Sequence, residues 1–398
     1  MISWLAAITL VAFPTQARAQ QPDDQKQERE DVHQLAPPVH GRELVKRVEQ
    51  ARQKGFAFLV KSQNADGSWG SHDPKVANLA NFGFQLRNRG SQDGVRMACT
   101  AICATALLDK PDRSQAENKA LARAAEALLD QSRFAYHRGE AFNTWGYGYK
   151  LDFLARWVQS PLGKADRQRV EASAKVCVDG LRRFQQADGG WNYYAPPVMG
   201  GTSMSFNTAT FALAMQRARS AGIQIVPAML ADAVKLLKRM RTVRGGFVYD
   251  ARFLHSARMV NELSAGSRTV VCALALHDAG ELEDADLIRS MAVFDEGENY
   301  LESGRKLIVP HTAVHQISGY FFFYGYNYAT ILAERLGERV DRERWDRFAW
   351  TFVRTQEPDG AWWDTPAADY GDKWGTGFVL QSIQRYLEYD RRAQAGDK

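Results

Sequence analysis

Residues 54–70 read KGFAFLVKSQNADGSWG, a stretch in which a helical pattern of apolar residues runs into a glutamine, a glycine turn and a tryptophan. The glutamine and the tryptophan are six residues apart, and the same offset returns twice later in the chain. The three pairs are Gln63 with Trp69, Gln185 with Trp191, and Gln356 with Trp362. A weaker copy, without the glutamine, ends at Phe247. These copies indicate a repeat around which the chain is organised.

The copies predict six units of two helices each. Successive copies end 122, 56 and 115 residues apart, so the unit is about 57 to 61 residues long and two copies have lost the motif. In each unit an amphipathic helix ends at the turn, and a second helix, richer in small apolar residues, follows it. The first helices are predicted at 42–63, 115–132, 165–186, 227–242, 283–303 and 342–356, and the second at 94–108, 145–158, 203–219, 266–279, 318–336 and 373–389. A helix that is apolar on all sides is buried on all sides, so the second set should lie inside. Helix pairs repeated at a fixed period predict an all-α, (α/α)6 toroid.

The pattern Lys-Gly-x-x-Phe-Leu-x-x-x-Gln-x-x-x-Gly-x-Trp in residues 54–69 resembles the QW motif of the squalene cyclase and protein prenyltransferase β-subunit repeat superfamily. The resemblance covers about residues 42–390, and it is greatest to the exported QW-repeat proteins of bacteria, which have no established activity. It implies a toroid whose central cavity holds the ligand. It also implies structural roles for the motif residues, with the glutamine capping a helix end and the tryptophan packing beneath it.

The active sites of that superfamily do not carry over to this sequence. The Asp-x-Asp-Asp motif of the cyclases, whose central acid must stay protonated, is absent. The zinc site of the prenyltransferases is absent as well, because residues 264–267 read Ser-Ala-Gly-Ser and no histidine opens the last inner helix. We therefore expect no metal and no cofactor, and the resemblance implies the fold without one of its known reactions.

The N-terminus has the features of an export signal. Residues 4–13 form an apolar run of the length of a signal-peptide core, and Ala17-Arg18-Ala19 is a small-x-small cleavage site, although no basic residue precedes the run. The run is too short to cross a membrane. We predict a signal peptide at 1–19, a disordered spacer at 20–41, the toroid domain at 42–390 and a tail at 391–398, with the mature protein periplasmic or extracellular.

Composition excludes some partners. The 51 basic and 46 acidic residues give a net charge of +5 that is spread along the chain, without a basic cluster interleaved with aromatics, so nucleic acid is not an expected partner.

The four cysteines, Cys99, Cys103, Cys177 and Cys272, all lie in apolar helical stretches. Cys99 and Cys103 share a helix face and could bind a metal, but no further ligand follows at a suitable spacing, and buried small side chains are the preferred interpretation.

The second and fifth turns have lost the motif and carry polar and aromatic insertions instead, which makes them candidate functional loops. In the fifth, His311 and His315 are four residues apart and could form a metal site, a catalytic or ligand-contacting pair, or a structural pair. An aromatic stripe follows on the inner helix, and it is either core or ligand-lining. The stripe consists of Tyr320, Phe323, Tyr324 and Tyr328.

Other polar and aromatic residues lie near the starts of inner helices, which would converge at one rim of the ring. These candidate ligand-binding residues are Asn143, Trp145 and Tyr147 in the second turn, Asn207 and Arg268. We predict that His311, His315, Tyr324 and Trp145 line one cavity mouth, with the two histidines and Tyr324 as candidate catalytic residues.

Three functions fit these features. The first is an exported enzyme, or a remnant of one, that acts on or binds an isoprenoid or another small hydrophobic molecule. The second is a non-catalytic module that binds a lipid or a glycan in the aromatic lumen. The third is polysaccharide cleavage, which other exported α/α barrels perform with paired carboxylates or with histidine and tyrosine in the lumen. The fold alone does not choose among them.

Overall fold

The computed structural model describes residues 37–71, 89–134, 144–194, 201–254, 262–307, 321–367 and 369–396. The predicted signal peptide at 1–19 and most of the predicted spacer at 20–41 lie outside these residues. None of the described helices is long and apolar enough to cross a membrane.

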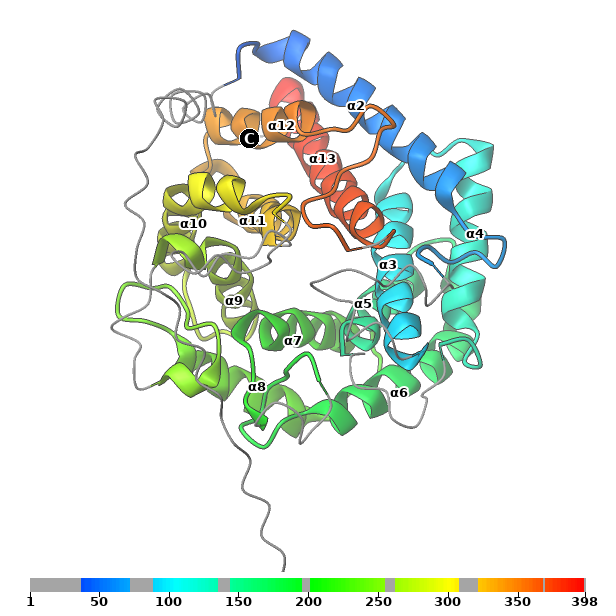
Figure 1. Ribbon diagram of the computed structural model, residues 1–398, viewed down its shortest axis with the longest axis vertical. Coiled ribbons are helices and arrows are strands. Elements are labelled where there is room, and N and C mark those ends of the chain that lie inside the picture. The colour runs from blue at the N-terminus through cyan, green and yellow to red at the C-terminus, as the bar shows by residue number, and fades with distance from the viewer. Residues whose placement is uncertain are drawn as a thin grey trace, which may run out of the picture.

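Twelve α-helices alternate between an outer and an inner position along the described chain. The outer helices are α2 (Gly41–Ser62), α4 (Gln115–Leu129), α6 (Arg167–Phe184), α8 (Pro227–Met240), α10 (Asp284–Gly304) and α12 (Arg342–Arg354). The inner helices are α3 (Arg89–Asp109), α5 (Thr144–Gln159), α7 (Ser205–Ser220), α9 (Gly266–Asp278), α11 (Phe322–Leu336) and α13 (Gly371–Ala395). In Figure 1 the six pairs form a ring, in which the last outer helix, α12, lies beside the first, α2. The predicted (α/α)6 toroid is confirmed.

The burial patterns of the two sets explain their positions. In α8 the buried residues follow one helical stripe, which runs from Met229 through Ala233 and Leu236 to Met240. Such a stripe faces the core while the opposite side faces water. In the inner helix α9, by contrast, every residue from Gly266 to Leu276 is buried.

The repeated spacing of glutamine and tryptophan builds a turn that joins the two helices of a repeat. The indole N–H of Trp69 donates to the carbonyl oxygen of Leu59 near the end of α2, at 2.9 Å. The backbone N–H of Trp69 donates to Oγ1 of Thr100 on the inner helix α3, at 3.1 Å. Trp191 and Trp362 make the same two kinds of bond, to Leu181 and Thr208 and to Phe352 and Thr376. Each tryptophan is fully buried.

The glutamine of each turn reaches the next repeat. Nε2 of Gln63 donates to the carbonyl oxygen of Ala120 on α4 at 2.8 Å, and Gln185 does the same to Met229 on α8 at 3.0 Å. Gln356, in the last repeat, donates to Ala51 of α2 at 2.8 Å and so closes the ring. The family resemblance implied a glutamine that caps a helix end. The amide instead links one repeat to the outer helix of the following one.

The weaker fourth copy keeps this link with different chemistry. Arg241 stands six residues before Phe247, where the other copies have glutamine, and the two form the same isolated bridge as Gln185 and Trp191. The guanidinium of Arg241 pairs with Asp286 near the start of α10, the next outer helix, at 2.6 Å. An ion pair therefore replaces the glutamine hydrogen bond at this junction.

The turn glycines are required by backbone conformation and by close packing. Gly360 has φ of +93°, which disfavours a side chain, and an added Cβ would lie 2.6 Å from the carbonyl oxygen of Lys54 on α2. Gly67 has φ of +86° and meets the backbone of Arg123 on α4 in the same way. The turn can thus approach the neighbouring outer helix closely only because it contains glycine.

Several helix boundaries differ by a few residues from those expected, and the largest differences are in α3 and α13. α3 begins at Arg89, five residues before the predicted start, and α13 continues to Ala395, so most of the predicted tail at 391–398 is helical.

The four cysteines are buried and unpaired, and burial raises the pKa of each thiol. Sγ of Cys103 lies 3.3 Å from the carbonyl oxygen of Lys373, which fits a packed side chain.

Candidate functional site

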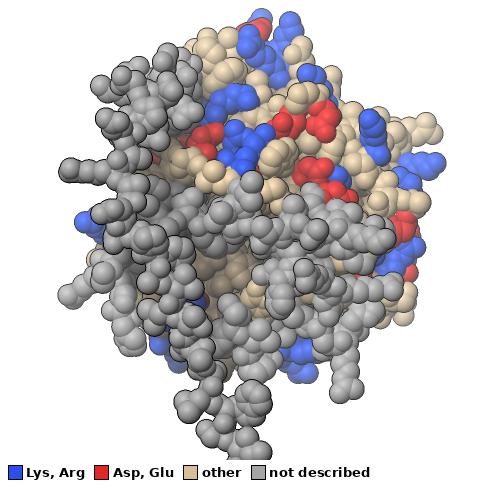
Figure 2. Space-filling model, viewed as in Figure 1, with Lys and Arg blue, Asp and Glu red and all other residues tan. Residues whose placement is uncertain are grey.

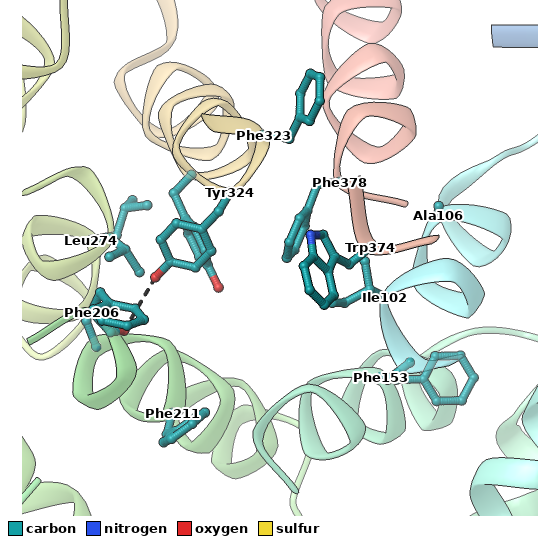
Figure 3. Close-up of a cluster of buried hydrophobic side chains, with 14 of the residues drawn as sticks. Ile102, Ala106, Phe153, Phe206, Phe211, Leu274, Phe323, Tyr324, Trp374 and Phe378 are labelled. Carbon is teal, nitrogen blue, oxygen red and sulfur yellow. Dashed lines mark hydrogen bonds between the residues drawn. The ribbon is translucent and has the colours of Figure 1, made fainter. Parts of the chain in front are cut away.

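An aromatic pocket lies inside the ring, between the first halves of the inner helices. It is a narrow space of about 30 Å³ between side chains from α3, α5, α7, α11 and α13. Figure 3 shows Phe206, Tyr324, Trp374 and Phe378 pointing from three of these helices toward the centre of the ring. The aromatic pocket is lined by Ala98, Ile102, Trp145, Tyr149, Phe206, Asn207, Thr210, Phe321, Tyr324, Trp374 and Phe378.

The rings of the aromatic pocket contact one another mainly edge to face. Phe206 meets Phe321 with centroids 4.7 Å apart and an interplanar angle of 87°, and Trp145 meets Trp374 at 6.3 Å and 86°. Tyr324 meets Phe378 at 6.1 Å and 82°. This arrangement is the one preferred by aromatic pairs, and it leaves ring faces to form the pocket wall.

A fixed amide is the main polar feature of the aromatic pocket. The indole N–H of Trp145 donates to Oδ1 of Asn207 at 2.7 Å. Since an indole nitrogen can only donate, the atom facing it must be the amide oxygen, and the orientation of Asn207 is determined. Its Nδ2 is buried and has no hydrogen-bond partner within the described part of the chain. Asn207 therefore holds an unused donor beside the pocket.

Tyrosine hydroxyls separate the aromatic pocket from a second cavity deeper in the ring. The hydroxyls of Tyr324 and Thr210 are 2.8 Å apart, and the rings of Tyr324 and Tyr328 have centroids 4.8 Å apart. Tyr149 and Thr210 line both cavities. Burial raises the pKa of Tyr328 to about 12, and it also raises the pKa values of Tyr149 and Tyr324 well above the ordinary value. These phenols are neutral hydrogen-bonding groups at physiological pH.

The second cavity, of about 50 Å³, is lined by both charged and apolar side chains and adjoins a wider opening at the C-terminal ends of the inner helices. Asp152 holds two arginines there, with Oδ2 2.8 Å from Nε of Arg156 and Oδ1 2.7 Å from Nε of Arg217. Burial alone would raise the pKa of Asp152, but the charges and hydrogen bonds of both arginines together lower it to about 2. The lumen is thus aromatic at one end and ionic at the other.

Six of the ten predicted catalytic or ligand-binding residues fall within the described chain. Trp145, Asn207 and Tyr324 line the aromatic pocket, and Tyr328 lines the polar cavity behind it. The other four, His311, His315, Asn143 and Tyr320, lie outside the described residues, so the predicted joint cavity mouth is seen here only through Tyr324 and Trp145.

Tyr147 and Arg268 are not among the residues that line the aromatic pocket, and the ligand-binding role expected of them stays a prediction. Tyr147 stands two residues after Trp145 on α5 and therefore points to the other side of the helix, where its ring lies 6.0 Å from that of Phe184. Arg268 is buried and donates to the carbonyl oxygens of Phe247 at 2.6 Å and Ser264 at 2.8 Å. These two hydrogen bonds link the turn at Phe247 to the residues just before α9.

Several lining residues were not predicted from the sequence. They are Ala98, Ile102, Tyr149, Phe206, Thr210, Phe321, Trp374 and Phe378. Trp374 and Phe378 are four residues apart on an inner helix, which places them on one face, and this spacing is the signal that could have found them.

A buried acid, Asp364, lies next to the aromatic pocket and accepts hydrogen bonds from residues of the helices that line it. Its Oδ2 accepts the backbone N–H of Phe323 at 3.0 Å, and its carboxylate also accepts a hydrogen bond from the indole of Trp374. Oδ1 has no partner among the described residues. Burial, only partly opposed by these hydrogen bonds, raises the pKa of Asp364 to about 7. The carboxyl group is therefore partly protonated at neutral pH.

We expect Asp364→Asn to flatten the pH dependence of stability. In the wild type the raised pKa means that the contribution of Asp364 is complete below about pH 4, the pKa of an unfolded aspartate, and is lost as the pH rises toward 7. Asparagine can accept the same two hydrogen bonds and does not ionise. The melting temperatures of both proteins between pH 5 and 8 measure this effect, and the variant should gain on the wild type as the pH rises. Parallel curves would contradict the prediction.

Charged side chains of both signs share the face of the molecule that Figure 2 shows. In Figure 2 the visible described basic and acidic side chains are interspersed. Many of them pair across neighbouring helices, as Arg169 does with Glu126 at 2.7 Å and Arg354 with Glu302 at 2.8 Å. Within the described residues no group of three or more histidine, cysteine, aspartate or glutamate side chains is placed to hold a metal ion.

The ring of six helix pairs around a lined lumen defines an α/α-toroid protein. Among solved structures, the chain is similar to the type II terpene cyclase MstE from Scytonema, including its complex with the substrate geranylgeranyl dihydroxybenzoate. In that complex the TM-score is 0.53 at 15% identity, over 87% of this chain and 99% of the cyclase. The apo cyclase gives the same TM-score at 16% identity.

A second similar structure is the GH76A α-1,6-mannanase from Salegentibacter sp. HEL1_6, with a TM-score of 0.51 at 12% identity over 85% of this chain and 98% of the mannanase. No protein-family profile matches the chain, and no curated protein matches it in sequence. At these identities the likeness establishes the toroid fold and leaves the reaction to the residues of the lumen.

Proposed function

We propose that the chain binds a small hydrophobic ligand of the isoprenoid type in the aromatic pocket and belongs to the terpene-cyclase-like branch of the toroid proteins. The observation that carries the proposal is the composition of the pocket wall. Among the described lining residues, seven are aromatic and none carries a carboxylate, ammonium or guanidinium group. The free space between the side chains is about 30 Å³, room for little more than a water molecule, so the ligand enters as the aromatic side chains move apart. Burial of an apolar ligand against such a wall is favourable by about 25 cal/mol per Å².

The same wall argues against glycan cleavage in this pocket. Glycoside hydrolysis generally uses two carboxylates that flank the scissile bond, and the described part of the aromatic pocket offers none. The acids of the lumen, such as Asp152, lie beyond the tyrosines and are paired with arginines. Glycan binding on the aromatic faces is the competing outcome in the experiment below.

The unused donor of Asn207 refines the kind of ligand. A buried N–H without an acceptor costs about 1–3 kcal/mol, and a ligand oxygen placed beside Nδ2 would remove that cost. We therefore propose an oxygenated isoprenoid, such as an alcohol, in preference to a pure hydrocarbon. As part of the same proposal, the apolar run at 4–13 directs the chain to export, so the ligand is met outside the cytoplasm.

Fluorescence titration tests the proposal because Trp145 and Trp374 both line the pocket. We expect saturable changes in tryptophan emission with farnesol and with squalene, and none with α-1,6-mannotriose. Asn207→Leu should weaken farnesol binding about tenfold and leave squalene binding unchanged. Asn118→Leu, a change on the exposed face of α4, is the matched control and should change neither.

A saturable response to mannotriose alone would overturn the proposal in favour of a glycan site. Mass spectrometry of lipids that co-purify from the native cell envelope identifies the natural ligand. Gas chromatography of the incubated ligand then distinguishes turnover from binding.

A further inference from the structure

The ionic end of the lumen opens into a cavity of about 610 Å³, which we call the charged mouth. Five arginines and three carboxylates line it, and two further carboxylates, Asp152 and Asp278, pair with its arginines from just outside the lining. The arginines are Arg156, Arg217, Arg335, Arg385 and Arg391. The tyrosines that bound the aromatic pocket lie between it and the charged mouth, so the two are separate places.

Three of these arginines have a structural explanation. Arg156, Arg217 and Arg335 stand in the last turns of α5, α7 and α11, where a cation offsets the negative end of the helix dipole. Each also pairs with an acid. Arg156 and Arg217 share Asp152, and Arg335 pairs with Asp278. Arg391 pairs with Glu388 at 2.5 Å. The fold accounts for their charges.

Arg385 differs from them in its position along the helix and in its hydrogen-bond partners. It lies in the middle of α13, ten residues before the helix ends at Ala395, so no helix terminus accounts for it. Its side chain is only 9% exposed. Nη1 donates to Oδ1 of Asn327 at 3.0 Å and to Oγ1 of Thr330 at 3.3 Å, and both acceptors are neutral. Glu334 remains 3.7 Å from Nε, beyond hydrogen-bond distance.

The guanidinium of Arg385 is therefore a buried cation whose one ion pair among the described residues, with Glu334, is long. Burial lowers its pKa to about 10, with Glu334 and Asp109 opposing the shift and Arg156 and Arg217 reinforcing it. Nε and Nη2 carry three of its five N–H donors, and neither makes a hydrogen bond to a described residue. Such a planar pair of donors matches the two oxygens of a carboxylate or a phosphate.

We propose that the charged mouth binds a small oxyanion, a phosphate or carboxylate group, on the guanidinium of Arg385, with Arg217 and Arg156 contributing from the facing wall. The ligand is a phosphorylated or carboxylated small molecule. This site goes beyond the proposed function, because it needs neither the aromatic pocket nor its ligand. The same oxyanion can be a free ion or the head of an amphiphile, and the experiment separates the two.

Calorimetric titration of the full chain with pyrophosphate, and separately with citrate, tests the proposal. Sodium chloride at matched ionic strength controls for general screening. We expect saturable binding of at least one of the two anions to the wild type. Arg385→Gln should weaken it about tenfold or more, since a hydrogen-bonded charge partner is lost. Arg289→Gln, which removes an exposed arginine on α10, is the matched control and should bind as the wild type does.

Two further measurements keep the outcome clear. Arg217→Gln should weaken binding about threefold, and because the Arg217 side chain is 37% exposed, this variant tests the site even if Arg385→Gln does not fold. Dodecyl phosphate, used below its micellar concentration, distinguishes the sources. If it binds much more tightly than pyrophosphate, and Arg385→Gln abolishes that binding, the oxyanion is an amphiphile's head. The proposal is overturned if no anion binds more strongly than chloride, or if Arg385→Gln and Arg217→Gln both bind as the wild type does.

Discussion

Replacement of Trp362 by alanine is expected to lower the free energy of unfolding by about 3–5 kcal/mol, the usual cost of removing a buried tryptophan. The indole is fully buried, and its N–H donates to the carbonyl oxygen of Phe352 at 2.8 Å. One edge of the ring rests on Gly55 of α2, where an added Cβ would lie 2.5 Å from the indole. Trp362 belongs to the last repeat and α2 to the first, so the cavity opens at the junction that closes the ring.

The neighbouring residue provides a matched control for this substitution. Trp363 is only partly buried. The ammonium group of Lys306 makes a cation–π contact with it, 4.2 Å from the ring centroid. A contact of that kind is worth about 0.5–1 kcal/mol, so Trp363→Ala should cost far less than Trp362→Ala. Urea unfolding followed by circular dichroism measures both losses. Equal losses would show that Trp362 has no special role in closing the ring.

The fold could be predicted because each repeat carries its own local signal. The six-residue offset between glutamine and tryptophan is visible in the sequence wherever the turn recurs. The threonine that accepts the backbone N–H of each tryptophan was not predicted, although its role is the same in all three copies. Thr100, Thr208 and Thr376 follow their tryptophans by 31, 17 and 14 residues, so no fixed spacing reveals them. Ring closure depends on contacts between Gln356 and Ala51, 305 residues apart, which no local pattern encodes.

The aromatic pocket was only partly predictable, for a physical reason. Polar residues such as Asn207 stand out on an otherwise apolar helix. Phe206 and Phe378 do not, because an aromatic side chain that faces the lumen looks the same in sequence as one that packs between two helices. Tyr147 lies away from the pocket because two residues correspond to about 200° of rotation away from Trp145.

The ion pairs at the ionic end of the lumen were not predicted, because the sequence spacing of the residues that form them is ordinary. Asp152 and Arg156 are four residues apart, the pattern of an exposed ion pair on a helix surface. Only the ring places both inside the lumen and brings Arg217 from the next inner helix to the same carboxylate. A pair of this kind on a surface contributes little, whereas a buried one leaves an unpaired charge when it is broken.

Asp152→Asn is therefore expected to destabilise the protein by about 3 kcal/mol at neutral pH, because Arg156 and Arg217 lose their common counter-ion in a partly buried site. The Asp152 side chain is 23% exposed, so we expect a loss of stability at the lower end of the range for buried ion pairs. Asp179→Asn is the matched control. Asp179 pairs with Lys175 at 2.6 Å on the exposed face of α6, and its loss should change stability by no more than about 0.5 kcal/mol.

The pH dependence of the difference identifies the cause. Because the two arginines lower the pKa of Asp152 to about 2, its contribution is complete above about pH 4, the pKa of an unfolded aspartate, and is lost as the pH falls through 2. Asparagine has no charge to lose, so the stability curves of the wild type and the variant should converge on acidification. Urea unfolding between pH 7 and pH 2.5 measures this convergence. A difference that stays constant over that range would assign the loss to packing and not to the ion pairs.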